Sequence, residues 1–223
     1  MRSKIIKSLF GFFATAAFCL LPAAHAETAF EKLVAKKAAE RAAKQAAVDR
    51  QSVLTKADID RLVIAIPKIQ NTAEQLDLPA LNEEQSKQMS MAAMNGNPTA
   101  TMAKLLGDTA ALSELDREST EAGYRNYTHY AEHFDIAFGV LSAESWILMA
   151  RGMVREGEEK PQPIDNLWIY ILDESKPASE REKLSTQLYE MLPRFGTKRE
   201  NAEMIYRNYD DLKPLVIPPR GKK

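Results

Sequence analysis

The stretch Tyr124–Arg155, YRNYTHYAEHFDIAFGVLSAESWILMARGMVR, decides the fold. Large apolar residues recur along it at spacings of three, four and seven, as at Phe134, Phe138, Leu141 and Leu148. Most positions after Phe134 are apolar or small, so the predicted helix is apolar nearly all round. Such a helix is typically surrounded by other helices. We therefore expect one long central helix over about residues 124–155.

Three charged residues, Asp135, Glu144 and Arg151, interrupt this apolar run. They fall well inside the ~20 residues that a membrane-spanning helix needs, so we do not expect the segment to cross a bilayer. Glu144 stands on a face that we expect to be buried. A buried carboxylate needs a hydrogen-bonding or charged partner, and the sequence does not name it.

The N-terminus has the three parts of a secretory signal peptide in order. A basic region is followed by the apolar run Leu9–Pro22 and by the small-residue site AHA at residues 24–26. We expect residues 1–26 to be removed by cleavage after Ala26 and the protein to be periplasmic. An uncleaved N-terminal anchor is the alternative, although the apolar run is short for a membrane span.

Composition limits the class of protein further. The 223 residues carry a formal net charge of −1, and the loss of three basic residues with the signal peptide would leave the mature chain more acidic. This balance does not favour nucleic-acid binding. The single cysteine, Cys19, lies in the expected signal peptide, so the exported chain must be stabilised by its core without disulfides.

The rest of the chain predicts an all-α protein. Residues 27–53 are rich in Ala, Lys, Arg and Glu and predict a helical arm or spacer; docking of this arm on a partner or an anionic membrane is the alternative. Residues 54–214 predict one globular domain, an irregular helical bundle around the central helix, and residues 215–223 a Pro/Lys tail.

Local signals mark several helix ends. Thr55 with Asp58, three residues on, predicts a capping box at the first helix of the domain. Pro67 predicts a kink or an end of that helix. Residues 164–172 predict a short helix that docks Trp168 on the central helix, and residues 197–212 predict the last helix.

One short motif points to metal chemistry. His129, Glu132 and His133 match H-x-x-E-H, which in some metalloproteases places two histidines on zinc and a glutamate as the base. A zinc hydrolase would use His129, His133 and a further carboxylate such as Glu203 as metal ligands, with Glu132 as the catalytic base. The pattern is short and has a high false-positive rate, so ordinary hydrogen-bonding roles for the histidines stay open.

A second motif occurs twice. The segments 117–127 and 199–209 both read R-E-x-x-E-x-x-Y-R-N-Y, with seven of eleven positions identical. On a continuous helix each copy would form an ion ladder at i, i+4 spacing, and the first would continue into His129 and His133. If the two helices pack side by side, their Arg, Asn and Tyr side chains would converge on one polar patch suited to an anion or an acidic partner segment.

These observations favour a binding or interaction role over catalysis, with no cofactor. The candidate surface consists of Tyr124, Arg125, Tyr127, His129, Tyr206, Arg207 and Tyr209. The expected partner is an envelope protein or a small anionic ligand, and the zinc hydrolase remains the alternative. The sequence carries no phosphate-binding glycine loop, nucleophile signature or dinucleotide fingerprint.

Overall fold

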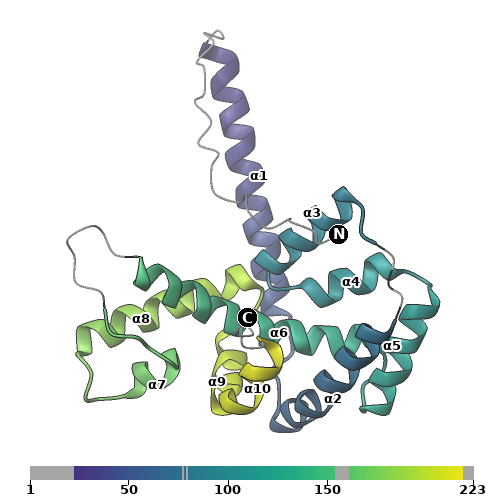
Figure 1. The fold of residues 1–223 in the computed structure, drawn as a ribbon. Helices are drawn as coiled ribbons and strands as arrows, with labels where there is room; N and C mark the ends of the chain where they lie inside the picture. Colours follow the sequence, from purple (N-terminus) through teal and green to yellow (C-terminus); the bar gives the residue numbers. More distant parts are fainter. Residues whose placement is uncertain (1–22, 77, 79, 154–160, 218–223) are drawn as a thin grey trace, which may run out of the picture. The chain divides into compact units, whose positions relative to one another are not determined.

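A computed structural model describes residues 23–76, 78, 80–153 and 161–217. All regular structure in these ranges is helical, as ten α-helices and one 3₁₀ helix, which confirms the all-α prediction (Figure 1). None of the helices described is long and apolar enough to cross a membrane, as predicted. Most of the expected signal peptide, residues 1–22, and the end of the tail, residues 218–223, lie outside the described residues.

The chain divides into two units after Ala42. Helix α1 (Ala23–Asp49) begins in the first unit and ends in the second. It is helical, as its composition predicts, and its described side chains between Glu31 and Ala47 are exposed. Val48, at 3% exposure, already belongs to the core of the second unit.

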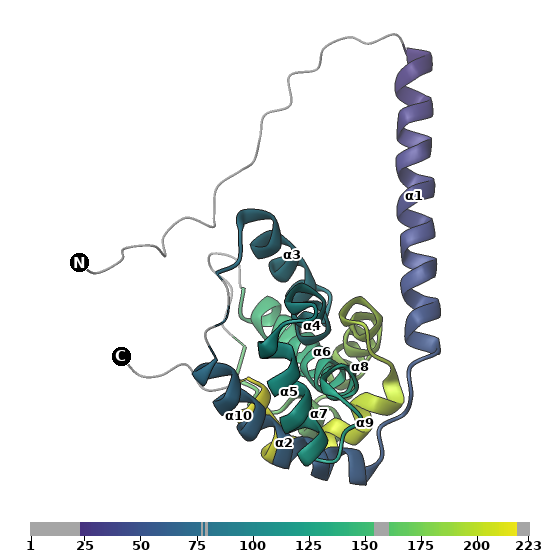
Figure 2. The same ribbon diagram turned by 90° about the vertical axis from the view of Figure 1, so that its right-hand side faces the viewer.

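The second unit is built around α6, which lies in the middle of the other helices in both views (Figures 1 and 2). It contacts α2, α4, α5, α8, α9, α10 and η1. The elements that follow α1 are α2 (Lys56–Gln75), α3 (Glu83–Met94), α4 (Pro98–Leu106), α5 (Ala110–Glu121), α6 (Tyr127–Gly152), α7 (Leu167–Leu172), α8 (Ala178–Met191), η1 (Leu192–Phe195), α9 (Arg199–Arg207) and α10 (Tyr209–Val216).

The central helix begins one turn later than predicted. A turn with Gly123 at φ 88° separates α5 from α6, and Asn126 caps α6 by accepting a hydrogen bond from the His129 N–H at 2.9 Å. Most of α6 is buried, as expected. Its C-terminal end differs, because Trp146, Met149 and Met153 are 46%, 47% and 67% exposed.

Two helices continue through an internal proline. The capping box of Thr55 and Asp58 opens α2 as predicted, and α2 continues through the exposed Pro67 to Gln75, so Pro67 does not end the helix. The predicted last helix is two helices, because the backbone leaves the helical path at Asn208, and α10 continues through Pro214. A proline inside a helix removes one backbone hydrogen bond and crowds the carbonyl four residues earlier, which can kink a helix without ending it.

The short helix α7 forms within the predicted range, and the side chain of Trp168 has an aromatic partner in α9. Its ring stacks on that of Tyr206 in α9, with centroids 5.2 Å apart and an interplanar angle of 3°.

Asp135 of α6 caps a different helix. Asn97, the N-cap residue of α4, makes no side-chain cap bond. The two carboxylate oxygens of Asp135 instead accept the N–H groups of Thr99 and Ala100, both at 2.9 Å. Burial raises the pKa of Asp135 to about 6, although these two bonds act to lower it. The capping charge thus comes from the central helix and fixes α4 against it.

Two glycines allow η1 to pass close to its neighbours. A Cβ on Gly139 of α6 would lie 2.5 Å from the carbonyl oxygen of Phe195, and a Cβ on Gly96 would lie 1.9 Å from the same oxygen. Gly96 also has a φ of 77°, which other residues rarely adopt. The Phe195 carbonyl is therefore wedged between the α3–α4 turn and the central helix.

A buried asparagine holds the segment that joins α1 to α2. The side chain of Asn201, in α9, accepts the Leu54 N–H at 2.7 Å. It donates to the Gln51 side chain at 2.9 Å and to the Ser52 carbonyl at 3.0 Å. Asn201 is fully buried, so these bonds satisfy its side-chain amide, which water cannot reach.

Candidate functional site

The turn between α5 and α6 is fixed by two capping interactions. Asn126 caps α6, and Asp116 of α5 accepts the Tyr127 N–H at 2.6 Å. These contacts set the direction in which the first copy of the repeated motif leaves α5. The predicted ladder is therefore broken: Arg117 pairs with Glu121 on α5, but Arg125 lies beyond the helix end.

Tyr124 is the centre of a ring cluster at this turn. The centroid of its ring lies 5.5 Å from those of His129, Tyr130 and His133, each in an edge-to-face arrangement. The two imidazole rings lie 4.8 Å apart, as expected for i, i+4 positions on one helix face.

Helix α2 brings two charged residues, Asp58 and Arg61, to the first copy of the repeated motif, and the motif itself does not indicate them. The guanidinium of Arg61 lies over the Tyr124 ring, 5.3 Å from its centroid. Asp58 Oδ1 is 3.6 Å from Arg61 Nη1 and 3.9 Å from His133 Nδ1. We call the group of Asp58, Arg61, Tyr124, Arg125, His129 and His133 the polar corner.

The polar corner contains two buried polar atoms without hydrogen bonds. Tyr124 and His133 are 3% and 6% exposed, and neither the Tyr124 hydroxyl nor His133 Nδ1 has a partner in the described part of the chain. Of the other residues of the polar corner, Arg125 is exposed and His129 is half-buried. Buried polar atoms are satisfied in most proteins, so this pair has hydrogen-bonding capacity that a water or a ligand could use.

The electrostatics of the corner favour an added negative charge. Burial lowers the pKa of His133, and His129, Arg61 and Arg125 lower it further, while Asp58 opposes them. Burial acts to raise the pKa of Asp58, but the two hydrogen bonds from Thr55 and the nearby cations outweigh it, so the pKa is lowered. No ion pair of Arg125 is present among the described residues.

The second copy of the motif forms a similar junction in a different place. Asn208 lies between α9 and α10, directly before α10, just as Asn126 lies directly before α6. Tyr206 and Tyr209 are buried at 5% and 6% exposure, whereas Arg207 is exposed. The Tyr206 hydroxyl, like that of Tyr124, is buried without a hydrogen bond.

The two copies do not form one patch. Tyr124 packs on His133, whereas Tyr209 bonds to Glu144, which is eleven positions further along α6. At the helical rise of 1.5 Å per residue, this separates the two places by about 16 Å along the helix axis. The polar corner therefore contains Tyr124, Arg125 and His129 from the expected surface. Tyr127 is buried against Tyr130, and Tyr206, Arg207 and Tyr209 lie elsewhere.

Glu144 has the partners that its burial requires. It is 1% exposed, and its Oε1 accepts the Leu167 N–H at 3.0 Å and the Tyr209 hydroxyl at 2.8 Å. Burial raises its pKa, and these two bonds act to lower it. Glu144 thus joins α6 to the start of α7 and to α10.

The zinc alternative rests on the histidine pair alone. Glu203 lies on α9 in an ion pair with Arg199 at 3.1 Å, and Glu132 is exposed. Across the residues that the structure describes, no three His, Cys, Asp or Glu side chains are grouped as metal ligands would be.

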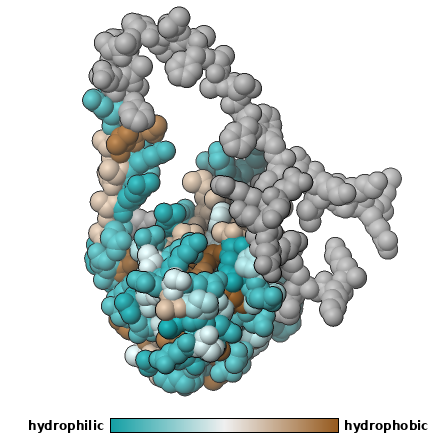
Figure 3. Space-filling view, turned by 90° about the vertical axis from the view of Figure 1, so that its left-hand side faces the viewer, coloured by the Kyte–Doolittle hydropathy of each residue, from teal (hydrophilic) through white to brown (hydrophobic). Residues whose placement is uncertain are grey.

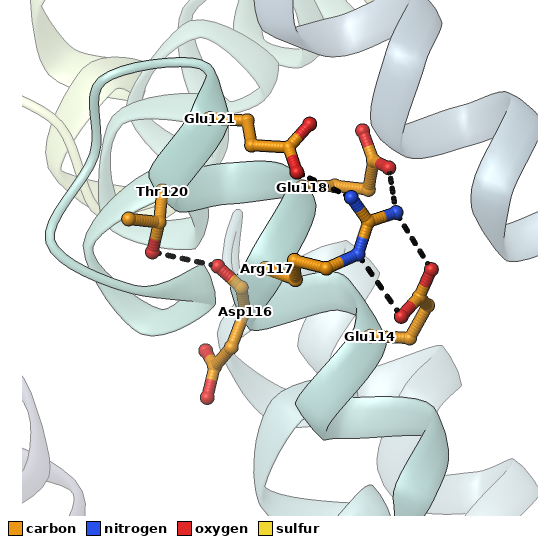
Figure 4. A network of polar contacts seen from close by, with 6 residues as sticks. All are labelled: Glu114, Asp116, Arg117, Glu118, Thr120 and Glu121. Carbon is orange, nitrogen blue, oxygen red and sulfur yellow. Dashed lines mark hydrogen bonds and ion pairs between the residues drawn. The ribbon is translucent and has the colours of Figure 1, made fainter.

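A polar cleft of about 580 Å³ lies between α2 and α5. One wall carries the Arg117 guanidinium, which binds the carboxylates of Glu114, Glu118 and Glu121 (Figure 4). The facing wall is formed by Lys68, Asn71, Thr72, Gln75 and Leu76. Because the Arg117 side chain is half exposed, this network contributes little to stability.

Hydrophobic residues are sparse on the face of the molecule drawn in Figure 3, where they form separate spots among hydrophilic ones.

Comparisons with known proteins give no relative: no family model matches the chain, and no curated protein and no solved structure is significantly similar to it.

Proposed function

We propose that this chain is an exported, periplasmic binding protein and that the polar corner binds an anionic group, such as a carboxylate, sulfate or phosphate. The observation that carries this proposal is that Arg61 and His129 contact the ring of Tyr124, that the charge of the exposed Arg125 acts on His133, and that two buried polar atoms of these residues have no hydrogen-bond partner within the described chain. Guanidinium groups suit oxyanions because their N–H groups form paired, charge-assisted hydrogen bonds.

The charge balance of the corner supports this ligand class. Its one carboxylate, Asp58, already accepts the Thr55 N–H at 2.9 Å and the Thr55 hydroxyl at 2.7 Å through Oδ2. Only Oδ1 of Asp58 is therefore left to interact with the two arginines and two imidazoles of the polar corner. A bound anion would offset the excess of positive charge without displacing the capping box of α2.

The repeated motif provides a matched control for the test. Arg125 and Arg207 occupy the same motif position and are both exposed, but Arg207 lies outside the corner. Calorimetric titration of the purified protein with sulfate and with citrate should show saturable binding. Arg125→Ala should weaken it about tenfold, which corresponds to one charge-assisted contact, and Arg207→Ala should leave it unchanged. Equal losses in both variants, or no binding, would contradict the proposal.

Export is tested separately. The proposal predicts that protein recovered from a bacterial periplasmic fraction begins at Glu27, after cleavage following Ala26. Mass spectrometry of the intact chain measures this directly. Protein that retains Met1, or that stays in the cytoplasmic fraction, would argue against the exported location without affecting the binding site.

A further inference from the structure

One carboxylate oxygen in the polar corner faces two side chains at once. Asp58 Oδ1 lies 3.6 Å from Arg61 Nη1 and 3.9 Å from His133 Nδ1. Both distances are longer than a hydrogen bond. The other oxygen of Asp58 is held by Thr55, so Oδ1 is the atom that Arg61 and His133 share, and it forms a hydrogen bond with neither of them.

We propose that the polar corner takes up its oxyanion together with a proton, so that the affinity rises as the pH falls from 7.5 to 5.5. The proton comes from solvent and is added to the imidazole of His133. Both ring nitrogens of the imidazolium carry hydrogen, so Nδ1 then donates to Asp58 Oδ1. The imidazolium then partly neutralises the Asp58 carboxylate, which weakens its attraction for Arg61 and leaves Arg61 available to bind the anion with Arg125 and His129. This inference rests on the proposed function of the same site.

Three elements contribute the titratable and charged groups that surround His133. Helix α2 provides Asp58 and Arg61, the α5–α6 turn provides Tyr124 and Arg125, and α6 itself provides His129. His129, Arg61 and Arg125 disfavour the imidazolium, as burial does, and Asp58 favours it.

The sign of the coupling follows from these charges. An anion between Arg61, Arg125 and His129 would offset the positive charges that disfavour the imidazolium, and would therefore raise the pKa of His133. By thermodynamic linkage, protonation of His133 must then raise the affinity for the anion by the same factor.

The unsatisfied atoms of the corner are consistent with this exchange. His133 Nδ1 has no hydrogen-bond partner in the structure as described, although it is buried and faces a carboxylate. A small shift of either side chain would complete the bond. The buried Tyr124 hydroxyl, which also lacks a partner within the described residues, is a neutral donor that an anion entering the corner could use.

Sulfate is the suitable probe, because its charge is constant over this pH range. We expect calorimetry at pH 5.5 to give an affinity about three- to tenfold higher than at pH 7.5. Binding should also take up protons, which is measured by repeating the titration at pH 6.5 in two buffers that differ in ionisation enthalpy. In His133→Gln the ratio of the two affinities should fall close to one, whatever the absolute affinity.

Two outcomes overturn the inference in distinguishable ways. If sulfate binds and depends on Arg125, but with the same affinity at both pH values and no proton uptake, the proton coupling is wrong and the binding site stands. If sulfate does not bind at either pH, the proposed function fails and the inference fails with it. If His133→Gln does not fold, proton uptake in His129→Gln decides the question, because that variant leaves His133 as the only imidazole of the polar corner.

Discussion

The hydroxyl of Tyr209 donates a hydrogen bond of 2.8 Å to Oε1 of Glu144, and this bond links the last helix to the middle of the central one. Both residues are buried, at 6% and 1% exposure. The carboxylate that looked out of place in an apolar helix is therefore a structural acceptor. It also holds the N–H of Leu167 at the start of α7.

We expect Tyr209→Phe to lower the free energy of unfolding by about 1–3 kcal/mol, because it removes a buried hydrogen bond to a carboxylate. Urea-induced unfolding followed by circular dichroism measures the change. The matched control is Tyr206→Phe, since the Tyr206 hydroxyl is buried without a partner in the described chain. That variant should be as stable as the unmodified protein, or more stable. A larger loss in Tyr206→Phe than in Tyr209→Phe would refute this assignment.

The stability of the unmodified protein relative to Asp135→Asn should increase in mild acid. Its pKa is raised from 3.8 to about 6 in the folded state, so between these values the folded chain binds more protons than the unfolded chain. Its contribution to stability is therefore largest below pH 4 and is lost as the pH rises through 6. From pH 7 to pH 4.5 the unmodified protein should gain about 2 kcal/mol relative to Asp135→Asn.

Unfolding in urea at pH 7.0, 5.5 and 4.5 tests this expectation for both proteins. The asparagine variant keeps one acceptor for Thr99 or Ala100 and loses the other, which shifts its stability by a constant amount. The comparison between the two proteins removes the contributions of all other titrating groups. Parallel pH profiles would show that the Asp135 carboxylate is not perturbed by burial.

Gly139→Ala and Gly152→Ala form a matched pair on α6. The new methyl group at residue 139 would lie 2.5 Å from the Phe195 carbonyl oxygen, whereas at residue 152 it meets nothing within 4 Å. We expect the first change to destabilise the fold by about 1–3 kcal/mol, because the backbone of η1 must move. The second should be neutral or stabilise it by up to about 1 kcal/mol, because alanine favours the helix. Thermal unfolding of the two variants gives the comparison, and equal melting temperatures would contradict it.

Asn201→Ala should loosen the segment between α1 and α2. It leaves the buried Leu54 N–H and the Ser52 carbonyl without their partner, at a cost of about 2–4 kcal/mol. Hydrogen exchange at the Leu54 amide should accelerate by at least about tenfold. Asn208→Ala is the control, because the Asn208 side chain donates to the nearby Met204 carbonyl and does not reach that segment. Unchanged exchange at Leu54 in Asn201→Ala would disprove the clamp.

Features that depend on local sequence were predictable. The capping box of Thr55 and Asp58 lies within four residues, and the apolar periodicity of α6 is a property of one segment. The break between α5 and α6 was harder to recognise, because residues 117–133 have helical spacing of charges. The turn depends on Gly123 and on the cap at Asn126, and these signals are weaker than the continuous pattern.

Features that depend on tertiary contacts were not predictable. Asp135 bonds to residues 35 and 36 positions away, and Asn201 bonds to Leu54, 147 positions away. The same limit applies to the polar corner. The motif indicated Tyr124, Arg125 and His129, but Asp58 and Arg61 reach the corner from another helix. The repeated motif suggested one surface, whereas packing against α6 places its two copies at different positions along that helix.

The most direct test of the central claim is a titration of isotopically labelled protein with sulfate, followed by two-dimensional ¹H–¹⁵N NMR at pH 6.0. Binding at the polar corner predicts saturable shifts of the amide resonances of Asp58–Arg61 and Tyr124–His133, with no comparable shifts at Tyr206–Tyr209. Shifts that are concentrated at Tyr206–Tyr209, or small shifts spread evenly over exposed lysines and arginines, would contradict the assignment of the corner as the binding site.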